Sequence, residues 1–149
     1  PIDIVIGIGH PVVRQRVVQR YQARENIGFP NLIHPSVWIE PNYVSMGVGN
    51  IVTRGCVFTC DIVVGDFNLF NLNVTVGHDC QIGSYNVINP GCNISGNVTL
   101  QDQILVGTGA QILEGRRIAS QVTVGAGAVV TSDIEKPGVW VGVPARSIR

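Results

Sequence analysis

The strongest constraint in this 149-residue sequence is a six-residue spacing of apolar side chains. With 45% hydrophobic residues overall, an unbroken run of fifteen such positions arises by chance only about once in a hundred thousand sequences. The run is Met46, Val52, Phe58, Val64, Phe70, Val76, Ile82, Ile88, Ile94, Leu100, Val106, Ile112, Ile118, Val124 and Val130. A hexapeptide period is typical of a parallel β-helix, in which each hexad supplies one short strand and three hexads complete one triangular coil. We therefore expect a mainly β fold with the repeat side chains stacked inside.

Small residues follow the same period. Glycine comes directly after the repeat position at places where closely stacked coils leave no room for a side chain: Gly47, Gly65, Gly77, Gly83, Gly107 and Gly125. Asn, Asp and Gly between the repeats suit the corners, because they tolerate left-handed backbone. Cys56, Cys80 and Cys92 fall four places after a repeat position and are predicted to fill the core, whereas Cys60 falls elsewhere and is predicted to be exposed.

The two ends of the chain depart from the repeat. Residues 2–9 are predicted to form a buried strand, and Pro11 is expected to begin a helix with Val13, Val17 and Tyr21 on its apolar face, Arg14 on its polar face and Gly28 at its end. We interpret residues 1–30 as a remnant of an N-terminal α/β, Rossmann-like substrate-binding domain, and residues 31–149 as the β-helix domain with a C-terminal extension that covers or extends the last coil. Ile33 and Ile39 lie one residue out of phase, which predicts a one-residue irregularity in the first coil.

Composition excludes several classes of protein. Ten basic and ten acidic residues cancel, so the chain has no basic surface for nucleic acid. No apolar run approaches the roughly 18 residues of a membrane span, and the first residues do not resemble a cleavable leader. We therefore expect a cytoplasmic protein.

The histidines are the first candidates for chemistry. His10 falls in a strand-to-helix turn and His34 beside a proline, whereas His78 lies two steps after repeat position Val76 and is followed directly by Asp79. An imidazole titrates near neutral pH, and an adjacent carboxylate raises its basicity and holds its tautomer. The pair therefore suits a general base, the alternative being that it is one more polar corner of a scaffold.

The segments NLIHPS, NLNVTVGHDCQIG, VGAGAVV and VWVGVPARSI resemble the left-handed β-helix sugar O- and N-acetyltransferase family, which includes the sialic acid O-acetyltransferases and the bacillosamine-pathway UDP-amino-sugar N-acetyltransferase. The resemblance implies a left-handed parallel β-helix, a homotrimer, and acetyl-CoA bound in a groove between adjacent β-helices. It also implies direct acetyl transfer to an amino or hydroxyl group of a sugar, which we expect to be nucleotide-linked.

The resemblance assigns roles to individual residues. His78 is the general base, Asp79 supports its basicity, and Asn71 lines the same site. Acetyl-CoA is held largely by backbone groups near Gly96, Thr108 and Ala126. Gly9 matches a substrate-contacting glycine, and Arg14 matches an arginine on the following helix. One departure is Val87, which stands where relatives often carry a second histidine that touches acetyl-CoA.

Three alternatives remain open. The adjacent Arg116 and Arg117 are candidates for the CoA phosphates, as are Arg146 and Arg149, although solvated turns are the simpler explanation of all four. A γ-type carbonic anhydrase would need three histidines converging on zinc, which the positions of His10 and His34 argue against, so no metal is expected. A non-catalytic trimeric scaffold, or a regulatory remnant lacking its substrate-binding half, is the third.

Overall fold

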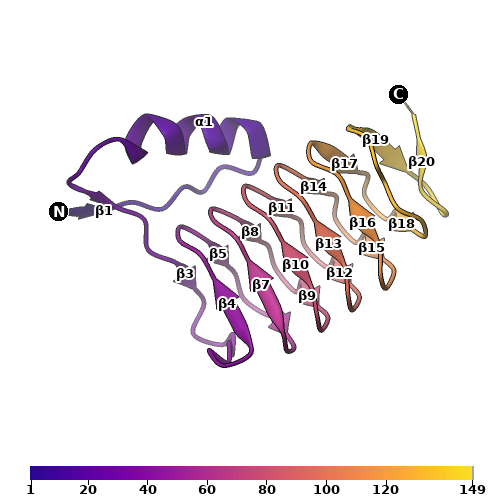
Figure 1. Ribbon diagram of the computed structural model, residues 1–149, viewed down its shortest axis with the longest axis horizontal. Helices are drawn as coiled ribbons and strands as arrows, with labels where there is room; N and C mark the ends of the chain where they lie inside the picture. Colours follow the sequence, from indigo (N-terminus) through magenta and orange to yellow (C-terminus); the bar gives the residue numbers. More distant parts are fainter. Residues whose placement is uncertain (149) are drawn as a thin grey trace.

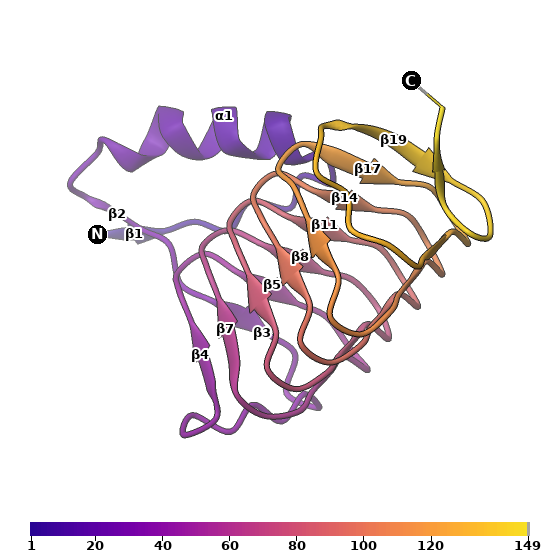
Figure 2. The ribbon, with the colours of Figure 1, turned by 45° about the vertical axis from the view of Figure 1, so that its right-hand side comes forward.

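The structure, a computed structural model, describes residues 1–148 and is a triangular β-solenoid with one helix along an edge (Figures 1 and 2). Sheet I contains β4 (Val44–Met46), β7 (Ile62–Val64), β10 (Gln81–Ile82), β13 (Thr99–Leu100) and β16 (Arg117–Ile118). Sheet II contains β3 (Leu32–Ile33), β5 (Ile51–Val52), β8 (Leu69–Phe70), β11 (Val87–Ile88), β14 (Leu105–Val106), β17 (Val122–Val124), β19 (Gly138–Val141) and β20 (Arg146–Ser147). Sheet III contains β6 (Val57–Phe58), β9 (Thr75–Val76), β12 (Asn93–Ile94), β15 (Gln111–Ile112) and β18 (Val129–Val130). The mainly β solenoid that the repeat predicts is confirmed.

The register of the sheets follows directly from the hexad. Residues 18 positions apart pair in parallel from coil to coil, as in Thr75, Asn93 and Gln111, so three hexads make one coil. Fourteen of the fifteen repeat side chains are buried in one continuous core, and Met46 is half-buried against it. Cys56, Cys80 and Cys92 are buried in the same core and Cys60 is exposed, as predicted.

Every corner of the solenoid turns through left-handed backbone. Fourteen consecutive positions six residues apart have φ between 55° and 78°: Gly49, Gly55, Asp61, Phe67, Asn73, Asp79, Tyr85, Gly91, Asn97, Gln103, Gly109, Gly115, Gln121 and Gly127. Most are Gly, Asn or Asp, the residues that adopt this conformation most easily. The glycines directly after the repeat position serve close stacking instead. A Cβ on Gly77, for example, would lie 2.6 Å from the backbone nitrogen of Gly96 in the next coil.

A ladder of four asparagines, of which Asn31 is exposed and Asn50, Asn68 and Asn86 are buried, joins successive coils at the corner between sheets I and II. The Oδ1 atoms of Asn31, Asn50 and Asn68 each accept the backbone N–H of the residue one coil on, at 2.8–2.9 Å. Asn86 continues the series by accepting the N–H of Ile104 at 2.7 Å. Because these buried amides are satisfied, they lock the register of the coils.

The N-terminal segment forms a small β–α–β unit. β1 (Ile2–Asp3) pairs in parallel with β2 (Ile27–Gly28), and α1 (Pro11–Gln22) connects them. The helix begins at Pro11 as predicted, but three other expectations were wrong. Residues 2–9 form no buried strand, since only Ile2–Asp3 is a strand and it is exposed. The helix ends at Gln22 with Ala23 as its cap, while Gly28 belongs to β2.

The third error concerns which face of α1 is buried. The buried face carries Pro11, Arg14 and Val18, and Val13 is 43% exposed. Arg14, expected on the polar face, is fully buried against the corner between sheets I and II. Its guanidinium donates to the carbonyl oxygens of Ile6 and Phe67 at 2.5 Å, and to those of Asn68 at 3.2 Å and Ile8 at 3.3 Å. Burial lowers the pKa of Arg14 to about 10. A single side chain thus fastens the helix to the solenoid.

Both ends of the solenoid follow the sequence interpretation. Ile33 pairs with Val52, a separation of 19 residues rather than 18, which confirms the one-residue irregularity. At the other end β19 pairs in parallel with β17 and β20 returns antiparallel to it, so the C-terminal extension continues sheet II. Arg149 lies outside the described residues. The helix found within residues 1–148 is too short and too polar to cross a membrane.

Candidate active site

His78 and Asp79 form an ion-pairing couple at the corner between sheets III and I, where the chain passes from β9 to β10. The Nδ1 atom of His78 lies 2.7 Å from Oδ2 of Asp79, and the two side chains are 55% and 60% exposed. Neighbouring coils hold the backbone on both sides. Asp79 donates its N–H to the carbonyl of Cys60 at 3.1 Å, and Asn97 donates to the carbonyl of His78 at 2.6 Å. The pair is therefore both accessible and fixed.

The electrostatics of the corner favour a basic imidazole. The hydrogen bond to Asp79 raises the pKa of His78 above its ordinary value. Desolvation acts in the opposite direction, the negative charges of Asp79, Glu114 and Asp61 add to the upward shift, and the net effect is a raised pKa. With Nδ1 occupied by the carboxylate, Nε2 is the atom left to take a proton from a substrate.

Gly96 lies against the His78 ring from the next coil. A Cβ at Gly96 would stand 2.6 Å from both Cε1 and Nε2 of His78, closer than any real contact. The imidazole therefore occupies the space that a side chain at position 96 would take. The sequence signal for this contact is the separation of 18 residues, one full coil, between His78 and Gly96.

The other expected site residues lie elsewhere on the triangle. Asn71 is at the corner between sheets II and III, where its Oδ1 accepts the N–H of Leu72 at 3.1 Å. Thr108 and Ala126 are exposed at the same corner, one coil apart, and Gly127 donates its N–H to the carbonyl of Thr108 at 2.8 Å. Within one chain the structure thus brings His78, Asp79 and Gly96 together, and it groups Asn71, Thr108 and Ala126 across sheet III from them.

The N-terminal candidates lie at the third corner. Gly9 is exposed in the loop before α1, and a small pocket of about 110 Å³ lies beside His10 at the start of that helix. Arg14 is fully buried and accordingly contacts no substrate. Val87 is also fully buried, under the outer face of sheet II with Ile51 and Leu69, so it cannot replace the ligand contact of a second histidine.

Metal chemistry finds no geometric support in the described part of the chain. Within residues 1–148, no group of three or more His, Cys, Asp or Glu side chains is placed to hold a metal ion. His34 instead contacts the hydroxyl of Ser36 at 2.8 Å. Cys60 is exposed one coil before His78, and partial desolvation together with the charges of Asp61 and Asp79 raises the pKa of its thiol.

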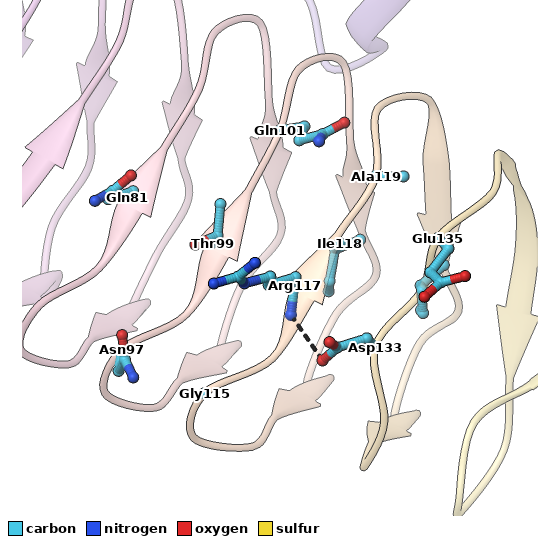
Figure 3. Close-up of a pocket in the computed structure, with 11 residues that line it drawn as sticks. Gln81, Asn97, Thr99, Gln101, Gly115, Arg117, Ile118, Ala119, Asp133 and Glu135 are labelled. Atoms are coloured by element: carbon cyan, nitrogen blue, oxygen red, sulfur yellow. Dashed lines mark hydrogen bonds between the residues drawn. The ribbon is translucent and has the colours of Figure 1, made fainter.

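A larger pocket of about 740 Å³ lies on the outer face of sheet I and was not anticipated from the sequence (Figure 3). Its lining includes Asn97, which directly follows Gly96 in the sequence, and Gly115, which lies one coil further on at the same corner. From there the pocket extends past Arg117 to Asp133 and Glu135. Arg116 is not among the residues that line this pocket, and its guanidinium pairs with Asp133 at 3.7 Å. The two adjacent arginines therefore have different surroundings.

The similarity of this chain to known proteins lies in its structure. No protein-family model matches the sequence, and no curated protein matches it significantly. Solved structures do match. The acetyltransferase domain of PglB from Neisseria gonorrhoeae is 32% identical, with a TM-score of 0.93 over 98% of this chain and 70% of that one. WeeI from Acinetobacter baumannii is 30% identical, with a TM-score of 0.91 over 98% and 70% of the two chains.

A third match is a variant of perosamine N-acetyltransferase from Caulobacter crescentus, solved in complex with CoA and GDP-perosamine. It is 28% identical, with a TM-score of 0.94 over 99% of this chain and 69% of that one. The hexapeptide-repeat solenoid together with these matches places the chain among the acyltransferases of the left-handed β-helix class. Within that class, the chain belongs to the sugar acetyltransferase family that the sequence resembles.

Proposed function

We propose that this protein transfers the acetyl group of acetyl-CoA to the amino group of a nucleotide-linked sugar. The observation that carries the proposal is the His78–Asp79 pair, which stands exposed on a chain that aligns over 98–99% of its length with sugar N-acetyltransferases. Among these, one structure contains CoA and GDP-perosamine and another contains acetyl-CoA. The sequence left amino and hydroxyl acceptors open, and these relatives favour the amine. A cytoplasmic location, where acetyl-CoA is made and used, suits this function.

The chemistry requires one base and no covalent acyl-enzyme. Nε2 of His78 takes a proton from the acceptor nitrogen as that nitrogen attacks the thioester carbonyl, and the C–N bond forms while the C–S bond breaks. The same proton then passes from His78 to the departing sulfur of CoA. Asp79, 2.7 Å from Nδ1, holds the ring orientation and stabilises the imidazolium that forms between these steps. Backbone groups near Gly96 place the thioester beside the base.

A homotrimer would complete the site. The candidate residues of the solenoid lie at two corners, that of His78 and that of Asn71, and both corners flank sheet III. In a trimer with sheet III turned toward the three-fold axis, the corner of His78 on one protomer faces the corner that carries the partner's Asn71, the partner's Thr108 and the partner's Ala126. The outer face of sheet III supports this arrangement with an ordered side-chain row, in which Thr75 donates to Asn93 at 2.7 Å and Asn93 donates to Gln111 at 3.0 Å.

We also propose a division of the chain into two domains. Residues 31–149 would form the acetyltransferase domain, and residues 1–30 the end of an α/β domain of Rossmann-like type that binds the acceptor through Gly9. The parallel pairing of β1 with β2 around α1 supports it, because a β–α–β crossover is the building unit of such domains.

The test is acetyl transfer by the wild-type protein and by His78→Ala. GDP-perosamine and other nucleotide amino sugars are offered with acetyl-CoA, free CoA thiol is followed by a chromogenic disulfide, and the N-acetyl product is identified by mass spectrometry. We expect His78→Ala to lower turnover about 10²- to 10⁴-fold. Its melting temperature and its native mass, three times the 16.0 kDa of the chain, should not change. Near-normal turnover by the variant would contradict the role of His78. A wild-type protein that neither turns over nor is stabilised by acetyl-CoA would support the scaffold alternative.

A further inference from the structure

The pocket on the outer face of sheet I begins at the candidate active site. Asn97 donates its N–H to the carbonyl of His78 at 2.6 Å, and Gly115 donates to the carbonyl of Gly96 at 3.0 Å, so two lining residues are bonded directly to the catalytic corner. From there the floor runs across three neighbouring strands through Gln81, Thr99 and Arg117, which pair in register. Adjacent strands lie about 4.8 Å apart, so this row spans about 10 Å. A volume of about 740 Å³ accommodates a substantial part of a nucleotide.

Among the described residues, Arg117 is the one positively charged residue that lines this pocket. Its backbone N–H, rather than its guanidinium, bonds to Oδ1 of Asp133 at 3.1 Å. Within residues 1–148 the guanidinium has no carboxylate within ion-pairing distance, and Figure 3 shows it extending from β16 over Thr99. An exposed guanidinium with five unused donors, in a pocket that is also lined by Gln81, Thr99 and Gln101, is suited to an anion with several oxygen acceptors.

Arg116 provides the contrast on the same strand end. Its side chain is 33% exposed, its Nε donates to the carbonyl of Glu114 at 3.1 Å, and its Nη1 pairs with Asp133. Arg116 is thus engaged within the chain, and its ion pair with Asp133 also offsets the carboxylate nearest to Arg117. Of the two adjacent arginines, only Arg117 presents its charge to the pocket.

We propose that the sheet I pocket binds the diphosphate of a substrate, with Arg117 as the residue that holds it. This inference rests on the proposed function, because both substrates of that reaction, acetyl-CoA and a nucleotide sugar, carry a diphosphate at some distance from the reacting atom. Arginine binds such groups through two parallel N–H···O bonds, a geometry that lysine or glutamine cannot reproduce. The pocket thereby joins the diphosphate to the corner at which His78 acts.

Glu135 is expected to weaken diphosphate binding in this pocket. It lines the far wall of the same pocket, is exposed, and has no ion-pair partner among the described residues. A bound diphosphate is repelled by this carboxylate. Replacing Glu135 with glutamine should therefore tighten diphosphate binding, while replacing Arg117 with glutamine weakens it.

The experiment measures dissociation constants by isothermal titration calorimetry for CoA and for GDP, with wild-type protein, Arg117→Gln, Arg117→Lys and Glu135→Gln. Arg16→Gln is the matched control, since Arg16 is an exposed arginine on α1 and its loss changes the net charge equally. We expect Arg117→Gln to weaken one of the two ligands about tenfold, Arg117→Lys to recover part of this loss, and Arg16→Gln to change neither. The weakened ligand identifies which substrate places its diphosphate in the pocket.

Turnover with S-acetylpantetheine, which lacks the diphosphate of CoA, separates this inference from the proposed function. If CoA is the pocket ligand, Arg117→Gln should raise KM for acetyl-CoA but leave the turnover of S-acetylpantetheine unchanged. Unaltered affinity of Arg117→Gln for both ligands, an equal loss in Arg16→Gln, or a loss in Glu135→Gln would each overturn the inference. A wild-type protein that binds CoA or GDP through Arg117 but acetylates no amino sugar would instead refute the proposed function.

Discussion

Replacing Gly96 with alanine should disable the proposed base without weakening the fold. The new Cβ would stand 2.6 Å from Cε1 and Nε2 of His78 and 3.1 Å from Cδ2. Favourable carbon contacts lie at about 3.5–4.0 Å, so the ring must retreat by about 1 Å. Gly96 does not have the left-handed backbone of the corner glycines, so alanine itself is tolerated there. The displacement of His78 is then the main consequence.

The magnitude follows from how freely the ring can move. The His78 side chain is 55% exposed, so it can swing toward solvent, and the free energy of unfolding should change by no more than about 0.5 kcal/mol. A displacement of about 1 Å, however, stretches the 2.7 Å contact with Asp79 and misplaces Nε2, which costs about 100-fold in kcat/KM. The assay is release of CoA thiol at saturating and limiting acceptor, together with thermal unfolding of the same samples.

Gly77→Ala is the matched control because its Cβ would meet backbone instead of a movable ring. It would lie 2.6 Å from the nitrogen and 2.9 Å from the Cα of Gly96, atoms that cannot swing away. We expect this variant to lose about 1–3 kcal/mol of stability. In a His78→Ala background, Gly96→Ala should cause no further loss of activity. Near-normal activity of Gly96→Ala, a stability loss matching that of Gly77→Ala, or a further loss in the double variant would refute the reasoning.

Two further predictions concern Asp79 and Arg14. The hydrogen bond to Asp79 raises the pKa of His78, and a general base must be neutral to accept a proton. In Asp79→Asn the acid limb of the kcat/KM pH profile should therefore move to lower pH, and the plateau should fall. A limb that stays in place would show that Asp79 does not tune the base. Arg14→Met leaves the carbonyls of Ile6 and Phe67 without their donors, so we expect it to lower the free energy of unfolding by about 2–4 kcal/mol. Proteolytic cleavage between α1 and β3 should also be faster. The control is Arg16→Met, because the side chain of Arg16 is exposed. Equal behaviour of the two arginine variants would argue against the fastening role of Arg14.

The hexad made the solenoid predictable, because a period of six places every repeat side chain in one core and every corner at one phase. The same register predicted the buried Cys80 and the exposed Cys60, and it located His78 and Asp79 at an outward corner. It failed at α1, where the arginine taken as polar surface is buried. A single helix shows which residues share a face, but two of the four carbonyl oxygens that accept from Arg14, those of Phe67 and Asn68, come from a corner more than fifty residues away.

The candidate site divides in the same way. The sequence by itself determined the coil, the corner and the residue types of the His78–Asp79 pair, since all three depend on local spacing. Only the tertiary structure decided that Gly96 faces the imidazole and that Asn71 and Thr108 lie at a different corner. It also decided that, within residues 1–148, the guanidinium of Arg116 is ion-paired and that of Arg117 is not. These facts depend on stacking between coils, where residues 18 positions apart meet and the direction of each side chain is set by its neighbours.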